Sequence, residues 1–266
     1  QEGRQLGLEI ESIGGKRQPP RTPRQDADTI IACLELHIEQ ADRLETNQTD
    51  IGIVTDIPGI SRYAIKVMGR SGHSGTTRMP DRQDALVAAS EVITTAQDTG
   101  IAIAEQDNKH FVATIGRIDV YPNGAATVPG EVNMVLDLRA SHEHSRYEFL
   151  RQLQTECMQI SKNRSCKIET QLISNASVAV MDNDLRQRLS HAAKSLNLSH
   201  IDLSSGAGHD MVHLSRIAPA AMVFIPCKDG LSHCPEEYAS AEAIAKGSAV
   251  LARTILALAS DEVNKG

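Results

Sequence analysis

The sequence comprises 266 residues, of which 41% are hydrophobic and 23% are charged, and its net charge is −7. This composition is ordinary for a globular protein and excludes a disordered or fibrous chain. Only 3% of the residues are aromatic, so few rings are available to stack on bases, and a negative surface repels phosphate backbones. We therefore expect no nucleic-acid partner.

Cysteine usage and hydropathy bear on where the protein resides. The five cysteines form no CxxC pair and leave one over, which favours a reducing compartment over a disulfide framework. No apolar run approaches the roughly 18 residues that a membrane span requires. We predict a cytoplasmic protein that does not interact with a membrane.

Regular structure is expected to begin after a polar, proline-rich loop at residues 16–27. Apolar and polar residues alternate over residues 30–40, which predicts a strand with one polar face, and His37 lies on that face. The region that follows predicts strands and helices in the order β-α-β-β-α-β, the ferredoxin-like arrangement. Its strands are predicted at 61–69, 111–120, 127–138 and 166–172, and its helices at 82–98 and 143–162.

Beyond residue 173 the pattern is typical of an α/β structure. A helix at 182–196, a short strand, a Gly-rich turn, a strand at 220–225 and a terminal helix at 240–258 are expected. The simplest division is an α/β domain formed by residues 1–58 and 171–266. It is interrupted by an α+β domain at residues 59–170.

Histidines in two of the polar stretches suit metal binding. His37 lies between carboxylates at the end of a predicted strand, where an imidazole is well placed to bind a divalent ion. The alternative is a histidine on an exposed strand face. His233 follows the apolar strand at 220–225, beyond which α/β sheets hold ligands, although an ordinary loop histidine fits equally well.

Two further stretches are rich in small residues. Residues 205–210 lead into a predicted helix, whose free N–H groups favour an anion such as a substrate carboxylate. A plain Gly-rich turn explains that stretch nearly as well. His73 lies in a Gly/Ser loop at 69–77, and such a loop can project a side chain into a neighbour's cleft. By itself it would be a hairpin loop.

Together the four stretches resemble the signatures of one enzyme family. The segments are ELHIEQ at 35–40, GHSGTT at 72–77, GAGHD at 206–210 and SHCPEE at 232–237. They look like the metal-dependent, M20-type amidohydrolases that act on N-carbamoyl-L-amino acids, allantoate or β-ureidopropionate. The resemblance runs over nearly the whole chain and corresponds to the C-terminal two-thirds of such a protein. Four ordered motifs are far more specific than any one of them.

The resemblance implies a metallopeptidase-like α/β catalytic domain interrupted by a ferredoxin-like lid, through which the protein forms a homodimer. It implies hydrolysis of a ureido C–N bond in a small carboxylate substrate by two divalent ions, zinc or manganese. His37 and His233 match metal ligands, and His73 matches a catalytic lid histidine that crosses to the partner's site and stabilises the oxyanion. The matching substrate contacts are Gln40, Arg139, Gly208 and His209, and a guanidinium such as that of Arg139 grips a carboxylate bidentately.

Two departures from the family pattern set limits on this expectation. In the family, a His-x-Asp segment and a Glu-Glu pair precede the His-Ile-Glu-Gln stretch, and the 36 residues before His37 contain no histidine. The letters His200-Ile201-Asp202 and Glu236-Glu237 stand elsewhere in the chain. We therefore expect a metal site that is incomplete or absent in this chain, and a chain that is inactive alone.

The second departure is Ala126, which stands where relatives carry an Asn that contacts the substrate, so Asn123 is the candidate replacement. Two alternatives to the ureido hydrolase remain. One is a catalytically dead relative that serves for dimerisation or ligand binding. The other is an M20 aminoacylase or dipeptidase with the same architecture.

Overall fold

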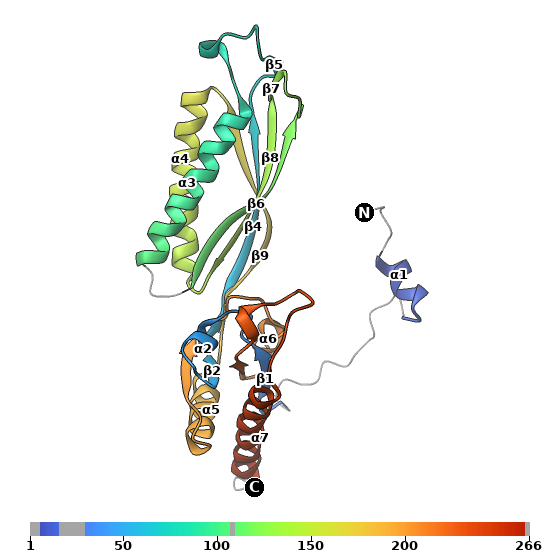
Figure 1. Cartoon of the computed structure of the whole chain (residues 1–266), viewed down its shortest axis with the longest axis vertical. Coiled ribbons are helices and arrows are strands. Elements are labelled where there is room, and N and C mark those ends of the chain that lie inside the picture. The colour runs from blue at the N-terminus through green and yellow to red at the C-terminus, as the bar shows by residue number, and fades with distance from the viewer. Residues whose placement is uncertain (1–5, 16–29, 107–109, 264–266) are drawn as a thin grey trace.

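A computed structural model describes residues 6–15, 30–106 and 110–263, so the proline-rich loop predicted at 16–27 lies outside the described residues. The short helix α1 (Leu6–Ser12) is the first described element. The remaining elements form two halves, each built on a four-stranded sheet, and the chain passes from one half to the other at β4 and β9 (Figure 1).

The first half is an antiparallel sheet with the strand order β6-β8-β4-β9. Helices α3 and α4 both cover one face of it (Figure 1). The predicted ferredoxin-like order is thereby confirmed, with the first and third strands of the unit in the centre. The elements are β4 (Gly59–Met68), α3 (Ala85–Gln106), β6 (Phe111–Tyr121), β8 (Glu131–Ala140), α4 (Glu143–Arg164) and β9 (Lys167–Ala176).

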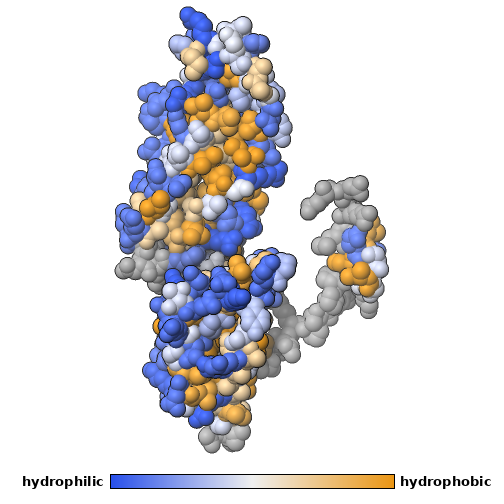
Figure 2. Space-filling model, in the orientation of Figure 1, coloured by the Kyte–Doolittle hydropathy of each residue, from blue (hydrophilic) through white to orange (hydrophobic). Residues whose placement is uncertain are grey.

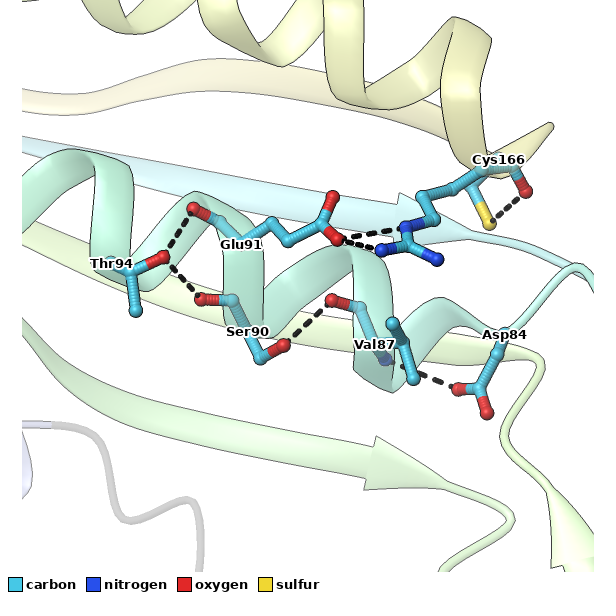
Figure 3. Close-up of polar contacts among 7 residues, drawn as sticks. Asp84, Val87, Ser90, Glu91, Thr94 and Cys166 are labelled. Atoms are coloured by element: carbon cyan, nitrogen blue, oxygen red, sulfur yellow. Dashed lines mark hydrogen bonds and ion pairs between the residues drawn. The ribbon is translucent and has the colours of Figure 1, made fainter.

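Local sequence explains why the helices of this half begin and pack where they do. The Asp84 carboxylate accepts hydrogen bonds from the backbone N–H groups of Leu86, at 3.0 Å, and Val87, at 3.2 Å, and so caps the start of α3. Figure 3 shows the bond to Val87. At the end of α4, Arg164 forms an ion pair with Glu91 of α3. Between these ends, apolar side chains of both helices meet alternate residues of β8 in one core.

The second half is a mixed sheet with the order β1-β12-β2-β11. Strand β12 runs parallel to β1 and antiparallel to β2, and β11 runs parallel to β2. Helices α5 and α7 pack on one face, and α2 and α6 pack on the other. The elements are β1 (Cys33–Ile38), α2 (Arg43–Thr46), β2 (Ile51–Val54), α5 (Asn183–Ser195), β11 (His200–Leu203), α6 (Met211–Leu214), β12 (Ala220–Ile225) and α7 (Ala241–Val263).

Several short elements were not predicted. Strand β2 has only four residues and contains Gly52, so no periodicity identifies it. Two two-stranded ribbons complete the structure: β3 (Asp56–Ile57) with β10 (Ala179–Val180), and β5 (Gly72–His73) with β7 (Thr127–Val128). Strand β9 continues to Ala176, beyond the domain boundary predicted at residue 170, and the exact division into domains stays a prediction.

Helix α7 is long and apolar enough to cross a membrane when judged by length and composition alone, over Ala241–Asp261. In the fold it packs against α5, β12 and β1, and its Ala243 and Val250 belong to the core. Gly247 is required for this packing, because a Cβ there would lie 2.5 Å from Leu36 Cδ1 and 2.7 Å from Ile225 Cγ2. Only 22% of this segment is buried, so α7 packs on the sheet along one side and leaves its other side exposed.

A buried arginine joins α4 to the ends of β4 and β9, the two strands through which the chain passes between the halves. Arg146 of α4 is only 4% exposed, and it donates hydrogen bonds to the Ser61 hydroxyl and to the Ala176 carbonyl, both at 2.9 Å. It also forms an ion pair with Glu143. A Cβ at Gly59 would lie 2.7 Å from its guanidinium, so a glycine is needed where the chain enters β4.

Candidate functional site

Two side chains of the mixed sheet and one from the loop before α6 come together as a group that can hold a metal ion. Glu35 and His37 are two residues apart on β1 and so project from the same face, and His209 lies just before α6, which packs on that face. The ligand atoms of these three residues lie within 4.8 Å of one another. The imidazole rings of His37 and His209 are 4.7 Å apart between centroids.

His209 is held in place by its surroundings. Its side chain is 2% exposed, its ring lies 5.4 Å from the Phe224 ring, and its Nε2 is 2.9 Å from the Ser205 hydroxyl. Burial, reinforced by the His37 imidazole, lowers the pKa of His209 to about 4, although Asp210 opposes the shift. His209 is therefore neutral near pH 7, which is the state in which an imidazole binds a metal.

The orientation of His37 also suits a ligand. Its Nδ1 lies 2.8 Å from the carbonyl oxygen of Ile38, and because a carbonyl only accepts, Nδ1 donates. The lone pair of Nε2 then remains available, the usual tautomer of a metal-binding histidine. Burial raises the pKa of the Glu35 carboxyl; His37 opposes the shift, and Asp210 adds to it.

The loop that contains His233 approaches this group from β12. Gln40 donates a hydrogen bond to the Ser232 hydroxyl at 2.8 Å, which joins the end of β1 to the loop. The Glu237 carboxylate accepts from Ser232 and from the backbone N–H of His233, and these bonds lower its pKa, with smaller effects from the charges of His233 and His37. His233 itself is exposed, has a positive φ of 59°, and is not a member of the group formed by Glu35, His37 and His209.

The lid reaches the Gly-rich loop through Arg139 and Ile60. Arg139 of β8 forms an ion pair with Asp137 at 2.7 Å, and its Nη1 is 3.5 Å from the Gly206 carbonyl oxygen. A Cβ at Gly208 would lie 3.6 Å from Ile60 Cδ1, so the loop that positions His209 packs directly under the lid. Two of the predicted substrate contacts, Arg139 and Gly208, therefore lie at the junction of the halves.

His73 and Asn123 lie elsewhere. His73 is on β5, paired with Thr127 of β7, and Ser74 donates to the Ala126 carbonyl, so the loops that contain His73 and Asn123 are neighbours. Strands β5 and β7 lie at the far end of the lid, at the opposite end from β1 and α6 (Figure 1). Both side chains are exposed there. Within one chain, neither of them meets His37 or His209.

Sequence reasoning did not assign a role to Glu35 or to Glu39. Glu39 is buried, its Oε2 accepts from the backbone N–H of Leu44 at 2.8 Å, and its Oε1 has no partner within the described structure. The alternation that places His37 on the polar face of β1 places both glutamates there too, so the signal was present. It did not show which of the two would meet His209, because the contact depends on the packing of α6.

The comparisons with known proteins decide the family. Residues 9–257 match the family described as peptidase family M20/M25/M40. The chain belongs to this family. That match spans both halves of the fold and all four motifs, as the resemblance implied.

Similar proteins of known name point in the same direction. The chain is 36% identical over 234 residues to an N-carbamoyl-L-amino-acid amidohydrolase of Paenarthrobacter aurescens, a match that covers 88% of this chain and 56% of that protein. It is 32% identical over 240 residues to an allantoate amidohydrolase of Escherichia coli, covering 90% and 57%. The chain thus spans little more than half the length of these relatives.

A solved structure shares the arrangement of the two halves. The crystal structure of an amidase of the hydantoinase/carbamoylase family from Burkholderia multivorans superposes with a TM-score of 0.81 at 32% identity. That match covers 96% of this chain and 60% of the other. The predicted fold class is confirmed.

Proposed function

We propose that the complete protein hydrolyses a ureido C–N bond in a small carboxylate substrate, an N-carbamoyl amino acid or allantoate. The supporting observation is the convergence of Glu35, His37 and His209 beneath the lid of an M20 family member. Relatives named for these two substrates, with 36% and 32% identity, support the substrate class. Their names apply to those proteins and come to this chain only by similarity.

The residues at this position fit a divalent ion. His37 offers a free Nε2 lone pair, neutral His209 offers an imidazole, and Glu35 offers a carboxylate, the donor types that zinc and manganese accept. Three such ligands hold one ion with positions left open. Two ions need more, so we propose that the centre of two zinc or manganese ions belongs to the complete protein. A bound ion would supply a water of lowered pKa and polarise the ureido carbonyl.

We propose His37 as a metal ligand, with two alternatives for the second histidine: His209, which the geometry groups with His37, or His233, which the family resemblance implies and which leaves His209 and Gly208 at the substrate. The bond from Gln40 to Ser232 supports the His233 alternative, because it ties the His233 loop to the strand that carries His37. Gln40 would contact the ureido group, and Arg139 would contact the substrate carboxylate. Asn123, whose loop neighbours that of His73 at the far end of the lid (Figure 1), would contact the substrate carboxylate of a partner's site. Substitution of His209 and of His233 by Asn separates the two ligand assignments. If His209 rather than His233 is the second ligand, H209N loses the ion and H233N keeps it.

We further propose a homodimer in which the lid supplies His73 to the partner's site. The separation of β5 from β1 within one chain supports this, since His73 does not meet His37 or His209 of its own chain (Figure 1). Its imidazole would donate to the oxyanion that forms when the ureido carbonyl is attacked. Mixing inactive H73A with inactive H37N should then restore part of the activity, because the mixed dimer regains one intact site. No recovery would contradict the supply of His73 across a dimer.

For the 266-residue chain alone we propose no turnover, because the ligands that it brings together suffice for one ion. We also propose a cytoplasmic location, which is supported by five cysteines that form no disulfide. A catalytically dead relative is the second candidate, and the same shortage of ligands favours it.

A substrate panel tests the proposal. Ammonia or amino-acid release is measured from allantoate, from an N-carbamoyl amino acid and from an N-acetyl amino acid, with the complete protein and with the 266-residue chain, in added manganese or zinc. We expect the complete protein to turn over a ureido substrate and the 266-residue chain to turn over none. Preference for the N-acetyl compound would indicate an aminoacylase, and no turnover of any compound would indicate the dead relative.

A further inference from the structure

A cavity of about 810 Å³ lies between the two halves, apart from the group formed by Glu35, His37 and His209, none of which lines it. The α/β half contributes Arg43, Asp56, Arg186 and Ser204 to its walls, and the lid contributes His110 and Ser141. Where the two halves meet, the surface seen in Figure 2 is mostly hydrophilic. The His110 ring packs over the Gly-rich loop, since a Cβ at Gly206 would lie 3.7 Å from its Cε1.

Two buried polar atoms on these walls have no partner. Throughout the described part of the chain, only three buried side-chain nitrogen or oxygen atoms lack a hydrogen bond, and His110 Nε2 and Arg186 Nε are two of them. The other end of the Arg186 guanidinium is satisfied, because Nη2 donates to Asp202 at 2.5 Å. Burying the Arg186 Nε–H without an acceptor is unfavourable, and a ligand that accepts from it would also accept from His110 in the tautomer that carries its proton on Nε2.

The walls contain two arginines, Arg43 and Arg186, and two carboxylates, Asp56 and Asp202, but their free hydrogen-bonding capacity is on the donor side. Arg43 has no ion-pair partner within the described residues, and its charge is close enough to His110 to lower the pKa of that imidazole, after the larger effect of burial. The buried Asp56 carboxylate already accepts from the Thr55 and Ser204 hydroxyls, at 2.6 and 2.7 Å. Its acceptor capacity is therefore largely used, whereas donors remain free on Arg43, Arg186 and His110.

We infer that this cavity is a second, non-catalytic binding site for a small anion that bears a carboxylate or a phosphate group. Arg43 and the Nε–H of Arg186 would donate to it from the α/β half, and the imidazole N–H of His110 from the lid. Arginine suits both groups, because its planar fork matches their oxygens. A bound anion would therefore bridge the two halves beside the loop that positions His209. This inference is independent of the proposed function, because it involves neither the metal group nor turnover.

Isothermal titration calorimetry of the purified protein tests the inference, with inorganic phosphate in one arm and succinate in the other. EDTA is present, so that no ion at His37 can hold the anion, and chloride keeps the ionic strength constant. Binding of at least one of the two anions is expected, and the arm that responds identifies the group. Because a hydrogen bond to a charged group contributes strongly to affinity, R43Q and H110Q should each weaken binding about tenfold or more.

Two control variants separate this cavity from other sites. Arg117 of β6 is 70% exposed and pairs with Asp119 on the surface, so R117Q should bind as the unchanged protein does. H37N should also keep binding. The inference is overturned if neither anion binds, if R43Q binds normally, or if R117Q or H37N loses binding to the same extent. Arg43 is exposed on a surface helix, so R43Q is expected to fold even if H110Q does not.

Discussion

Replacing Arg146 by Met tests whether this one buried side chain fixes α4 to the ends of β4 and β9, where the chain passes between the halves. The substitution removes donors to Ser61, Asn175 and Ala176. The Ser61 hydroxyl still donates to Asn175 Oδ1 at 2.8 Å, so these two groups continue to satisfy each other. The half-buried Ala176 carbonyl is left without this donor, and the loss of such a partner costs about 1–3 kcal/mol.

Lost packing around the guanidinium adds to that cost, whereas the exposed Glu143 is resolvated by water. We therefore expect R146M to lower the free energy of unfolding by about 2–4 kcal/mol. Arg151 on the same helix is the matched control. It is 55% exposed and pairs with Glu148 three residues earlier, so R151M should cost less than about 1 kcal/mol.

Urea unfolding followed by circular dichroism measures the stability of both variants. An unchanged dependence of the unfolding free energy on urea concentration would confirm that the same surface is exposed on unfolding. The reasoning is refuted if R146M loses less than about 1 kcal/mol, or if R151M loses as much. In the first case α4 would be held to β4 and β9 by backbone and core contacts alone.

Two further predictions concern stability. Burial holds the pKa of His209 at about 4, whereas a free histidine titrates near 6.5, so the unfolded chain binds one more proton than the folded chain between these pH values. Acidification from about pH 7 to pH 4 in EDTA should therefore lower the free energy of unfolding by about 1–3 kcal/mol. The H209N variant should not show this loss. Equal pH dependence of the two proteins would contradict this. G247A should destabilise the protein by about 1–2 kcal/mol, because its methyl group would overlap Leu36. G100A in α3 should stabilise it by about 0.5–1 kcal/mol, because the nearest neighbour of the added methyl group would lie 3.6 Å away. Thermal melts measure both. Stabilisation by both would show that the α7 contact relaxes freely.

Periodicity was sufficient for the long elements and failed for the short ones. Helix α4 and strand β8 have enough repeats of buried residues for their period to be read, and both were predicted within a few residues of their bounds. Strand β2 has four residues and α2 has four, too few to show a period. Their places are set by tertiary contacts, such as the packing of Leu44 under Phe224, which the sequence does not display.

For the candidate site, too, the sequence identified individual residues but not the contacts between them. The motifs identified His37 and His209 because each lies in a distinctive short segment, but their 4.7 Å approach depends on α6 folding back across β12 and β1. The role of Arg146 and the cavity between the halves had no signal, since an arginine on a helix is usually exposed. Separation of His73 from His37 follows from the length of the lid strands and could not be read from spacing.

Native mass spectrometry, with zinc or manganese present, tests the metal-dependent account most directly. We predict two divalent ions per chain in the complete protein and at most one in the 266-residue chain. H37N should lower the metal content of both, whereas H144N, which changes an exposed histidine of α4, should leave it unchanged. A complete protein without bound metal, or an H37N variant with its full complement, would contradict the account.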